Sequence, residues 1–167
     1  MAGFQFNTVA DIRVGAGAAQ QLGALCQQLG IAKPLIVTDP GLVQMGLVDP
    51  VRDGVARVCD EVSVFSAVTA DPSESVVEAA LHALRTASAD GVIGLGGGSS
   101  MDVAKVIAVL ATGQQSLPDL YGVDQVTSER FPLVLIPTTA GTGSEVTPVA
   151  VITTGATTKA GISSSRL

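Results

Sequence analysis

Short apolar runs alternate with stretches of helical spacing along most of the chain. The runs have the length and composition of buried strands, and they lie at residues 35–39, 62–65, 92–95 and 131–137. Between them, apolar residues at helical spacing predict helices over 22–29, 42–55, 73–89 and 99–112, the second of them broken near 46–50. Regular alternation of strand and helix predicts an α/β fold with a doubly wound, mostly parallel sheet.

The two ends of the chain have a different pattern. Near the N-terminus, alternating apolar and polar residues predict an edge hairpin from Phe4 to Val14. This hairpin either packs on the sheet of its own chain or exchanges strands with a second subunit. At the other end, residues 149–153 and 159–163 predict a last strand and its partner.

Composition limits the partners that the protein can have. Hydrophobic residues make up 47% of the 167 positions, and only nine basic and fifteen acidic side chains are available to cover the surface. The net charge of −6 and the pI near 4.5 argue against binding of nucleic acid or of an anionic membrane. Because charged side chains are so few, we expect an apolar face that meets another domain or another copy, and we predict a homo-oligomer.

Cysteine and histidine offer little chemistry in this chain. Cys26 and Cys59 lie inside predicted elements without metal-type spacing, so we expect buried thiols in a reducing compartment. His82, the only histidine, lies off the apolar stripe of its helix and is predicted to be a surface residue. Met1 to Gly15 has no apolar core of a signal peptide, and no apolar run approaches the roughly 18 residues of a membrane span. We therefore expect a cytoplasmic protein.

A glycine loop follows the third buried run. Gly96, Gly97 and Gly98 precede a helix for which Ser99 is the predicted N-cap and Asp102 the acidic partner in a capping box. Such a loop lets a phosphate approach backbone N–H groups at the positive end of a helix dipole. The loop matches neither the Walker A pattern nor Gly-x-Gly-x-x-Gly, so a phosphate site and a simple tight turn are both open interpretations.

Polar groups also follow two neighbouring strands. Asp39 ends the first buried run, where a carboxylate can accept hydrogen bonds from an adenosine ribose or cap the helix that follows. Residues 138–147 follow the fourth run and offer hydroxyl and N–H donors to a ribose or a diphosphate. Ligands of doubly wound sheets bind at the carboxyl ends of the strands, so we expect Asp39, Gly96–Ser99 and Thr138–Ser144 to gather at one edge.

The two loops lie within long motifs. These are Gly96-Gly-Gly-Ser-Ser-Met-Asp-Val-Ala-Lys105 and Pro137-Thr-Thr-Ala-Gly-Thr-Gly-Ser-Glu-Val-Thr147. With them, and with Val37-Thr-Asp39 and Lys159-Ala-Gly-Ile, the chain resembles the N-terminal domain of the iron-containing, or group III, alcohol dehydrogenases. The resemblance covers nearly all of the chain and implies a Rossmann-like, dinucleotide-binding fold.

The resemblance also implies a cofactor and the residues that bind it. The cofactor is NAD(H), with NADP(H) less favoured because the acid at position 39 would repel a 2′-phosphate. By analogy, Asp39 lies at the adenosine ribose, and Asp71 lies beside the cofactor where relatives often carry Asn. The residues expected under the diphosphate are Gly97, Gly98 and Ser99. Those expected along the track from adenine to nicotinamide are Thr138, Thr139, Thr142 and Ser144, with Val151 and Lys159 close to the ribose.

Two residues of the first motif have no expected contact with the cofactor. A carboxylate that faced a diphosphate would repel it, so we expect Asp102 to cap the helix and orient the N–H groups of the loop. Lys105 lies one turn further on and is predicted to be the i,i+3 partner of Asp102.

The resemblance further implies a second domain. Family members continue into a helical domain that carries the metal ligands, an aspartate and three histidines, so the ligands for iron or zinc would lie beyond Leu167. We therefore expect residues 1–167 to be a dinucleotide-binding domain and a fragment of a longer enzyme, with no catalytic or metal-binding residue of its own. The intact enzyme would transfer hydride between an alcohol or aldehyde and the nicotinamide.

Two other functions compete with this one. Maleylacetate reductases are relatives that work without a metal, but they tend to differ in the loop corresponding to 138–145, and the sequence found here favours the alcohol dehydrogenases. The second alternative is a non-catalytic nucleotide-binding or assembly module that oligomerises through the Phe4–Val14 edge. Adding back a C-terminal domain would distinguish such a module from a truncated enzyme.

Overall fold

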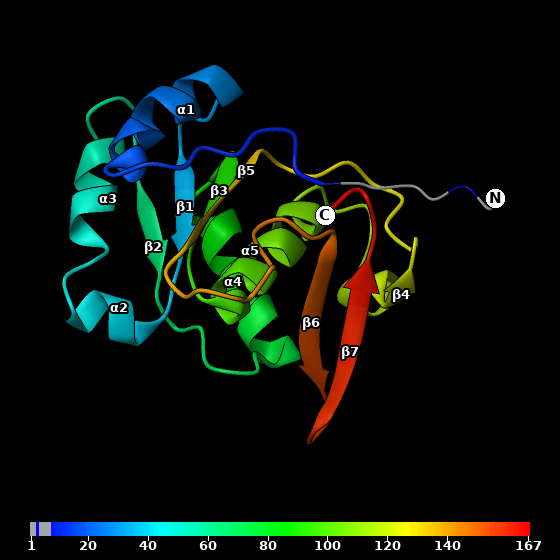
Figure 1. Ribbon diagram of the computed structural model, residues 1–167. Helices are drawn as coiled ribbons and strands as arrows, with labels where there is room; N and C mark the ends of the chain where they lie inside the picture. Colours follow the sequence, from blue (N-terminus) through cyan, green and yellow to red (C-terminus); the bar gives the residue numbers. More distant parts are fainter. Residues whose placement is uncertain (1–2, 4–7) are drawn as a thin grey trace.

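The computed structural model describes residue 3 and residues 8–167 (Figure 1). It is an α/β fold with a four-stranded sheet and a separate three-stranded sheet. The elements, where η denotes a 3-10 helix, are η1 (Ala18–Gln21), α1 (Leu22–Leu29), β1 (Pro34–Val37), α2 (Pro40–Gln44), α3 (Asp49–Val55), β2 (Ser63–Phe65), α4 (Glu74–Thr86), β3 (Gly91–Gly96), α5 (Gly98–Leu110), η2 (Leu117–Leu120), β4 (Gly122–Val123), β5 (Leu133–Pro137), β6 (Val149–Thr154) and β7 (Thr158–Ser163).

The central sheet is parallel throughout, with the strand order β2-β1-β3-β5. β1 and β3 are buried along their whole length because each lies between two strands and helices cover both faces (Figure 1). Side chains of β1 alternate between the faces: Leu35 and Val37 pack with α4 and α5, and Ile36 packs on the side of α1 and α3. The predicted doubly wound, mostly parallel sheet is confirmed.

The helix expected over 42–55 is broken where the sequence predicts. Gly46 has a φ of 69°, a left-handed conformation that suits glycine, and α3 begins at Asp49 with a proline in its first turn. The strand over 131–137 forms as β5, but it is half-buried and not fully buried as expected. β5 is the last strand of the sheet, so only one of its edges is paired.

The N-terminal hairpin is not formed in the part that the structure describes. Residues 8–14 contain no strand, while Phe4 and Phe6 lie outside the described residues. Alternation alone does not make a strand stable, because a strand needs a partner for its ladder hydrogen bonds. Val9, Ile12 and Val14 are exposed, Val14 to 93%.

The second sheet has the order β4-β7-β6. β6 and β7 pair antiparallel, as predicted for the last two apolar segments, and β4 joins β7 in parallel. The sequence pattern missed β4 because it has only two residues. β6 is an edge strand of this sheet and lies against α5, on the side of the molecule away from α1 and α3 (Figure 1).

Cys26 and Cys59 are buried free thiols, and His82 is exposed on α4, as predicted. Burial raises the pKa of the Cys26 thiol to about 12, which makes the reactive thiolate rare at neutral pH. Within residues 8–167, no helix is long and apolar enough to span a bilayer.

Candidate functional site

The glycine loop joins β3 directly to α5. β3 ends at Gly96, and α5 begins at Gly98 with Gly97 as its N-cap residue. Gly96 has a φ of 150°, and a Cβ atom on it would lie 2.7 Å from the hydroxyl oxygen of Ser100. A side chain therefore cannot be placed there without movement of the helix start. Ser99 is not the N-cap as predicted: Gly97, two residues earlier, has that position, and no side chain caps the helix.

The loop after β5 lies beside the glycine loop, as expected. The N–H of Thr138 donates to the carbonyl of Gly96 at 2.9 Å. A Cβ atom on Gly97 would lie 3.3 Å from the hydroxyl of Thr139, and one on Gly98 would lie 3.7 Å from Thr142. Backbone N–H groups at the start of α5 and threonine hydroxyls are thus within reach of one ligand.

Asp39 lies at the same edge of the sheet. Its carboxylate accepts a hydrogen bond from the N–H of Leu42 at 3.1 Å, so it caps α2. Its other oxygen lies 3.4 Å from the position that a Cβ atom would take on Gly96. The capping interpretation is confirmed, and the proximity to the glycine loop is what a ribose contact requires. The contact with a ribose stays a prediction.

A cavity of about 330 Å³ opens in front of the start of α5. It brings together predicted residues from distant parts of the chain, namely Asp71, Gly98, Ser99, Val151 and Lys159, and is also lined by Pro72, Asp102 and Thr153. The remaining predicted residues do not line it; they are Asp39, Gly97, Thr138, Thr139, Thr142 and Ser144.

The wall of the cavity opposite the glycine loop is built from the turn after β2 and from β6 and β7. Asp71, with a φ of 51°, forms an ion pair with Lys159, in which the Nζ and Oδ1 atoms are 2.6 Å apart. The turn is attached to β6, because the N–H of Thr153 donates to the carbonyl of Pro72 at 2.8 Å. A positive charge and a negative charge therefore face the cavity as a pair.

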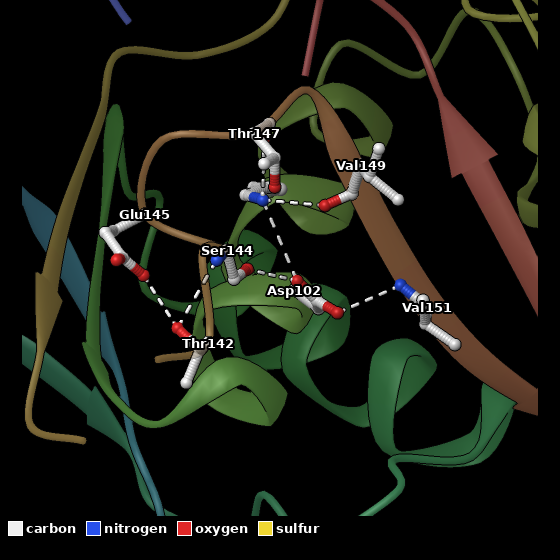
Figure 2. Close-up of polar contacts among 8 residues, drawn as sticks. Asp102, Thr142, Ser144, Glu145, Thr147, Val149 and Val151 are labelled. Carbon is white, nitrogen blue, oxygen red and sulfur yellow. Dashed lines mark hydrogen bonds and ion pairs between the residues drawn. The ribbon is translucent and has the colours of Figure 1, made fainter. Parts of the chain in front are cut away.

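Asp102 has a contact that the sequence did not reveal. Its carboxylate accepts hydrogen bonds from the hydroxyl of Ser144 and from the N–H of Val151, the latter at 2.9 Å (Figure 2). The predicted helix cap is therefore wrong: Asp102 is directed across to β6 and to the loop after β5. No local signal distinguishes the two, because the partners are more than forty residues away in sequence.

Lys105 is the largest fully buried side chain of the described residues, with 1% exposure. Its ammonium group lies 3.7 Å from the Asp102 carboxylate, which confirms the predicted i,i+3 pair. It also donates to the carbonyls of Thr147 and Val149 at 3.0 and 2.7 Å. Burial lowers its pKa, and the charge of Asp102 partly opposes that shift.

Two of the expected cofactor hydroxyls have partners within the chain. Thr142 donates to Glu145 at 2.7 Å, and this hydrogen bond is the main cause of the lowered pKa of Glu145. Ser144 donates to Asp102 and is buried. Both hydroxyls can still accept a hydrogen bond, but their protons are not free for a ligand.

The described residues fit a dinucleotide better than a metal ion. The glycine loop leaves the start of α5 open, and a cavity with polar walls adjoins it. In residue 3 and residues 8–167, no three His, Cys, Asp or Glu side chains come together as they would around a metal ion.

Comparison with known proteins gives one family. Residues 10–167 match the family model described as "Iron-containing alcohol dehydrogenase". Among curated proteins, the chain is 40% identical over 153 residues to a choline dehydrogenase of Bacillus subtilis, and the match covers 90% of this chain and 38% of that protein.

Solved structures agree with this match. The fold superposes on a crystal structure of 1,3-propanediol oxidoreductase with a TM-score of 0.94 and 34% identity, covering 99% of this chain and 44% of that one. A sulfoacetaldehyde reductase from Bifidobacterium kashiwanohense, crystallised in complex with NAD+, matches with a TM-score of 0.86 and 28% identity, covering the whole of this chain and 45% of that one. The chain thus spans less than half the length of these relatives.

Proposed function

The chain belongs to the iron-containing alcohol dehydrogenase family, and we propose that it is the NAD(H)-binding domain of such an enzyme. The observation that carries the proposal is the glycine loop at the start of α5. It lies beside the threonine-containing loop that follows β5, and it opens onto a cavity. Backbone N–H groups at a helix N-terminus bind a diphosphate without any cationic side chain. The NAD+ complex of the related sulfoacetaldehyde reductase supports the choice of cofactor.

The reaction proposed for the whole enzyme is the reversible oxidation of an alcohol to an aldehyde. Bound NAD+ would supply the acceptor for the hydride of the alcohol carbon, and the hydroxyl proton would leave to solvent, which gives the aldehyde and NADH. The described residues bind and orient the cofactor for this step. The described residues form no metal site by themselves. The metal and the substrate pocket are features that we propose for the whole enzyme.

Titration of the purified chain with NADH, followed by nicotinamide fluorescence, tests the proposal. The decisive variant is Gly98→Val, because a Cβ atom at Gly98 has room, with its nearest neighbour 3.7 Å away. The chain should therefore fold, while the added side chain occupies the space in front of the helix N-terminus. We expect the affinity for NADH to fall by about a hundredfold, the equivalent of two good hydrogen bonds.

The matched control is Gly54→Val. Gly54 lies in α3, and a Cβ atom there would have no neighbour within 4 Å. This variant should bind NADH as the unsubstituted chain does. Equal affinity of the Gly98 variant, or failure of the unsubstituted chain to bind NADH, would contradict the proposal.

Discrimination between NADH and NADPH rests on Asp39. A carboxylate beside the glycine loop repels the 2′-phosphate of NADPH. Asp39→Asn removes the charge and keeps an oxygen that can cap α2. The variant should narrow the affinity ratio of NADH to NADPH by about tenfold. A ratio near one in the unsubstituted chain would show that Asp39 has no such role.

Self-association is a further part of the proposed function. Val9, Ile12 and Val14 lie in the segment from Phe4 to Val14 and are exposed in the described residues, which supports an interface with a second copy. Sedimentation of the unsubstituted chain and of an Ile12→Asp, Val14→Asp variant measures this. A monomer in both cases would contradict it.

A further inference from the structure

The free edge of β6 is paired by side chains where a neighbouring strand would otherwise lie. β6 hydrogen-bonds with β7 on one side only. On its other side, the carbonyl of Val149 accepts from Lys105 at 2.7 Å and the N–H of Val151 donates to Asp102 at 2.9 Å. The N–H of Thr153 donates to Pro72. Asp102 and Lys105 thus provide an acceptor and a donor that follow the register of the strand.

The same two side chains hold the end of the loop that follows β5. Lys105 donates to the carbonyl of Thr147 at 3.0 Å, and Asp102 accepts from the hydroxyl of Ser144 (Figure 2). The ammonium group has two carbonyls and one carboxylate around it, which matches its three donors. The buried ammonium group thus donates two hydrogen bonds and forms one ion pair, with Asp102 at 3.7 Å.

Both residues belong to α5, whose first turn forms one wall of the cavity. Gly98 and Ser99 lie at the start of the helix, and the opposite wall contains Val151, Thr153 and Lys159 from β6 and β7. The contacts of Asp102 with Val151 and of Lys105 with Val149 are the polar links from α5 to β6 in the described part of the chain. They join the two walls together with the apolar packing of Ala150 and Ile152 in the core that α5 shares.

We propose that Asp102 and Lys105 are positioning residues of the dinucleotide site, which hold β6 and the 144–148 segment at a fixed distance from the N-terminal turn of α5. The inference rests on the proposed function, because it takes the cavity to be the cofactor site. Lys105 is not among the residues that line the cavity, and the carboxylate of Asp102, which does line it, is engaged by Ser144 and Val151. Asp102 and Lys105 keep the wall with Val151 and Lys159 in place before the cofactor binds, so that less binding energy is used to order the site.

The test compares NADH affinity with local amide exchange. Lys105→Met replaces the ammonium group with an apolar side chain of similar length, and Asp102→Asn changes only the charge and one oxygen. In both variants we expect hydrogen exchange to accelerate more over residues 144–153 than over β3, whose exchange reports the change in global stability, and NADH affinity to fall by about tenfold. Asp102→Asn is the milder change and decides the question if Lys105→Met does not fold.

The matched control is the pair Asp49 and Arg52 on α3. It has the same i,i+3 spacing, with 3.1 Å between the Oδ1 and Nη1 atoms, but both side chains are exposed. Asp49→Asn with Arg52→Met should change neither the exchange over 144–153 nor the affinity for NADH.

Three results would overturn the inference. The first is unchanged NADH affinity in a variant whose 144–153 segment exchanges faster. The second is an acceleration of exchange in β3 as large as the acceleration in residues 144–153. That would mean that the substitution lowers the stability of the whole chain without a local effect on 144–153. The third is unchanged exchange over 144–153. If the unsubstituted chain does not bind NADH, the proposed function fails together with this inference, whereas binding by that chain and equal binding by both variants refutes the inference alone.

Discussion

The two faces of the central sheet are filled by different kinds of side chain. On the face of α1 and α3, Ile36, Ile93 and Leu95 pack with apolar residues and with the buried thiol of Cys26. On the other face, α5 packs its apolar side chains against β3 and β5 and directs a buried lysine and its aspartate toward β6. The face of α1 and α3 therefore serves only as a hydrophobic core. The face of α5 is a hydrophobic core that also holds the charged pair beside the cavity.

This difference indicates what the buried pair is for. Removing a lysine and an aspartate from water costs several kcal/mol, and well-packed apolar residues often stabilise a fold as well or better. The face of α1 and α3 uses that simpler solution. A charged pair on the face next to the cavity is therefore better explained by geometry, since it fixes the register of β6, than by stability.

The largest expected effect is on the buried pair itself. Lys105→Met leaves Asp102 without its cation and the carbonyls of Thr147 and Val149 without a donor, so we expect the free energy of unfolding to fall by about 3–5 kcal/mol. Asp102→Asn together with Lys105→Met should recover a large part of that loss. Urea unfolding followed by far-UV circular dichroism measures the unsubstituted chain, the two single variants and the double variant. Additive losses in the double variant would show that the two residues act independently.

The next effect compares close packing on the two faces. A Cβ atom on Gly94 would lie 2.9 Å from the Cβ of Ala104 and 3.4 Å from the backbone of Met101, and neither can rotate away. Gly94→Ala should therefore reduce the free energy of unfolding by about 2 kcal/mol.

Gly23 on α1 is the control for this substitution. A Cβ atom there would lie 2.9 Å from a methyl group of Val58, a side chain that can move, and 3.2 Å from the carbonyl oxygen of Gly54. Alanine also favours the helix by about 1 kcal/mol, so Gly23→Ala should be nearly neutral in the same unfolding measurement. Equal losses at both positions would contradict the difference between the faces.

A pH series examines the face of α1 and α3. Because the pKa of Cys26 is raised from 9.0 to about 12, the folded state keeps the thiol proton over this range while the unfolded state loses it. This contribution to stability is complete below pH 9 and is lost as the pH rises toward 12, at about 1.4 kcal/mol per pH unit. The difference in unfolding free energy between the unsubstituted chain and Cys26→Ala should decline accordingly. A constant difference would mean that the thiol titrates normally.

The smallest effect concerns the attachment of the second sheet to α4. The hydroxyl of Tyr121 donates to the carboxylate of Glu74 at 2.9 Å, and burial, together with this acceptor, raises the pKa of Tyr121. Tyr121→Phe should lower the free energy of unfolding by about 1 kcal/mol without affecting NADH binding. Glu74→Gln keeps an acceptor and should cost less. A larger loss of unfolding free energy in Glu74→Gln than in Tyr121→Phe would indicate that the charge of Glu74 stabilises the fold through a group other than Tyr121.

The sequence was a good guide wherever a pattern is local. The buried runs became β1, β3 and β5 because apolar strands have few alternatives in a parallel sheet, and Gly46 with the proline of α3 ended and restarted a helix. The same reasoning placed Asp39 and the two loops at one edge. The position of that edge follows from topology, which alternation of strand and helix already specifies.

What the sequence did not reveal depends on contacts between distant segments. Asp102 and Lys105 have the spacing of an ordinary surface pair, and the spacing was correctly recognised. Their burial depends on β6, because their partners there are backbone N–H and C=O groups. The sequence does not reveal which backbone groups a side chain will contact. The described part of the predicted Phe4–Val14 hairpin, residues 8–14, forms no strand for the opposite reason. Its alternation is a real signal, but residues 8–14 find no strand to pair with in the described part of the chain.

The free edge of β6 also bears on how the protein avoids aggregation. An exposed strand edge is a template on which another chain can add a strand, and exposed valines, here Val149 and Val151, make such addition more favourable. With its outward carbonyl and N–H groups engaged by Lys105 and Asp102, β6 has few free groups to offer to another chain. The buried pair thus also protects this edge from pairing with another chain. A protein without the pair should aggregate more readily through β6.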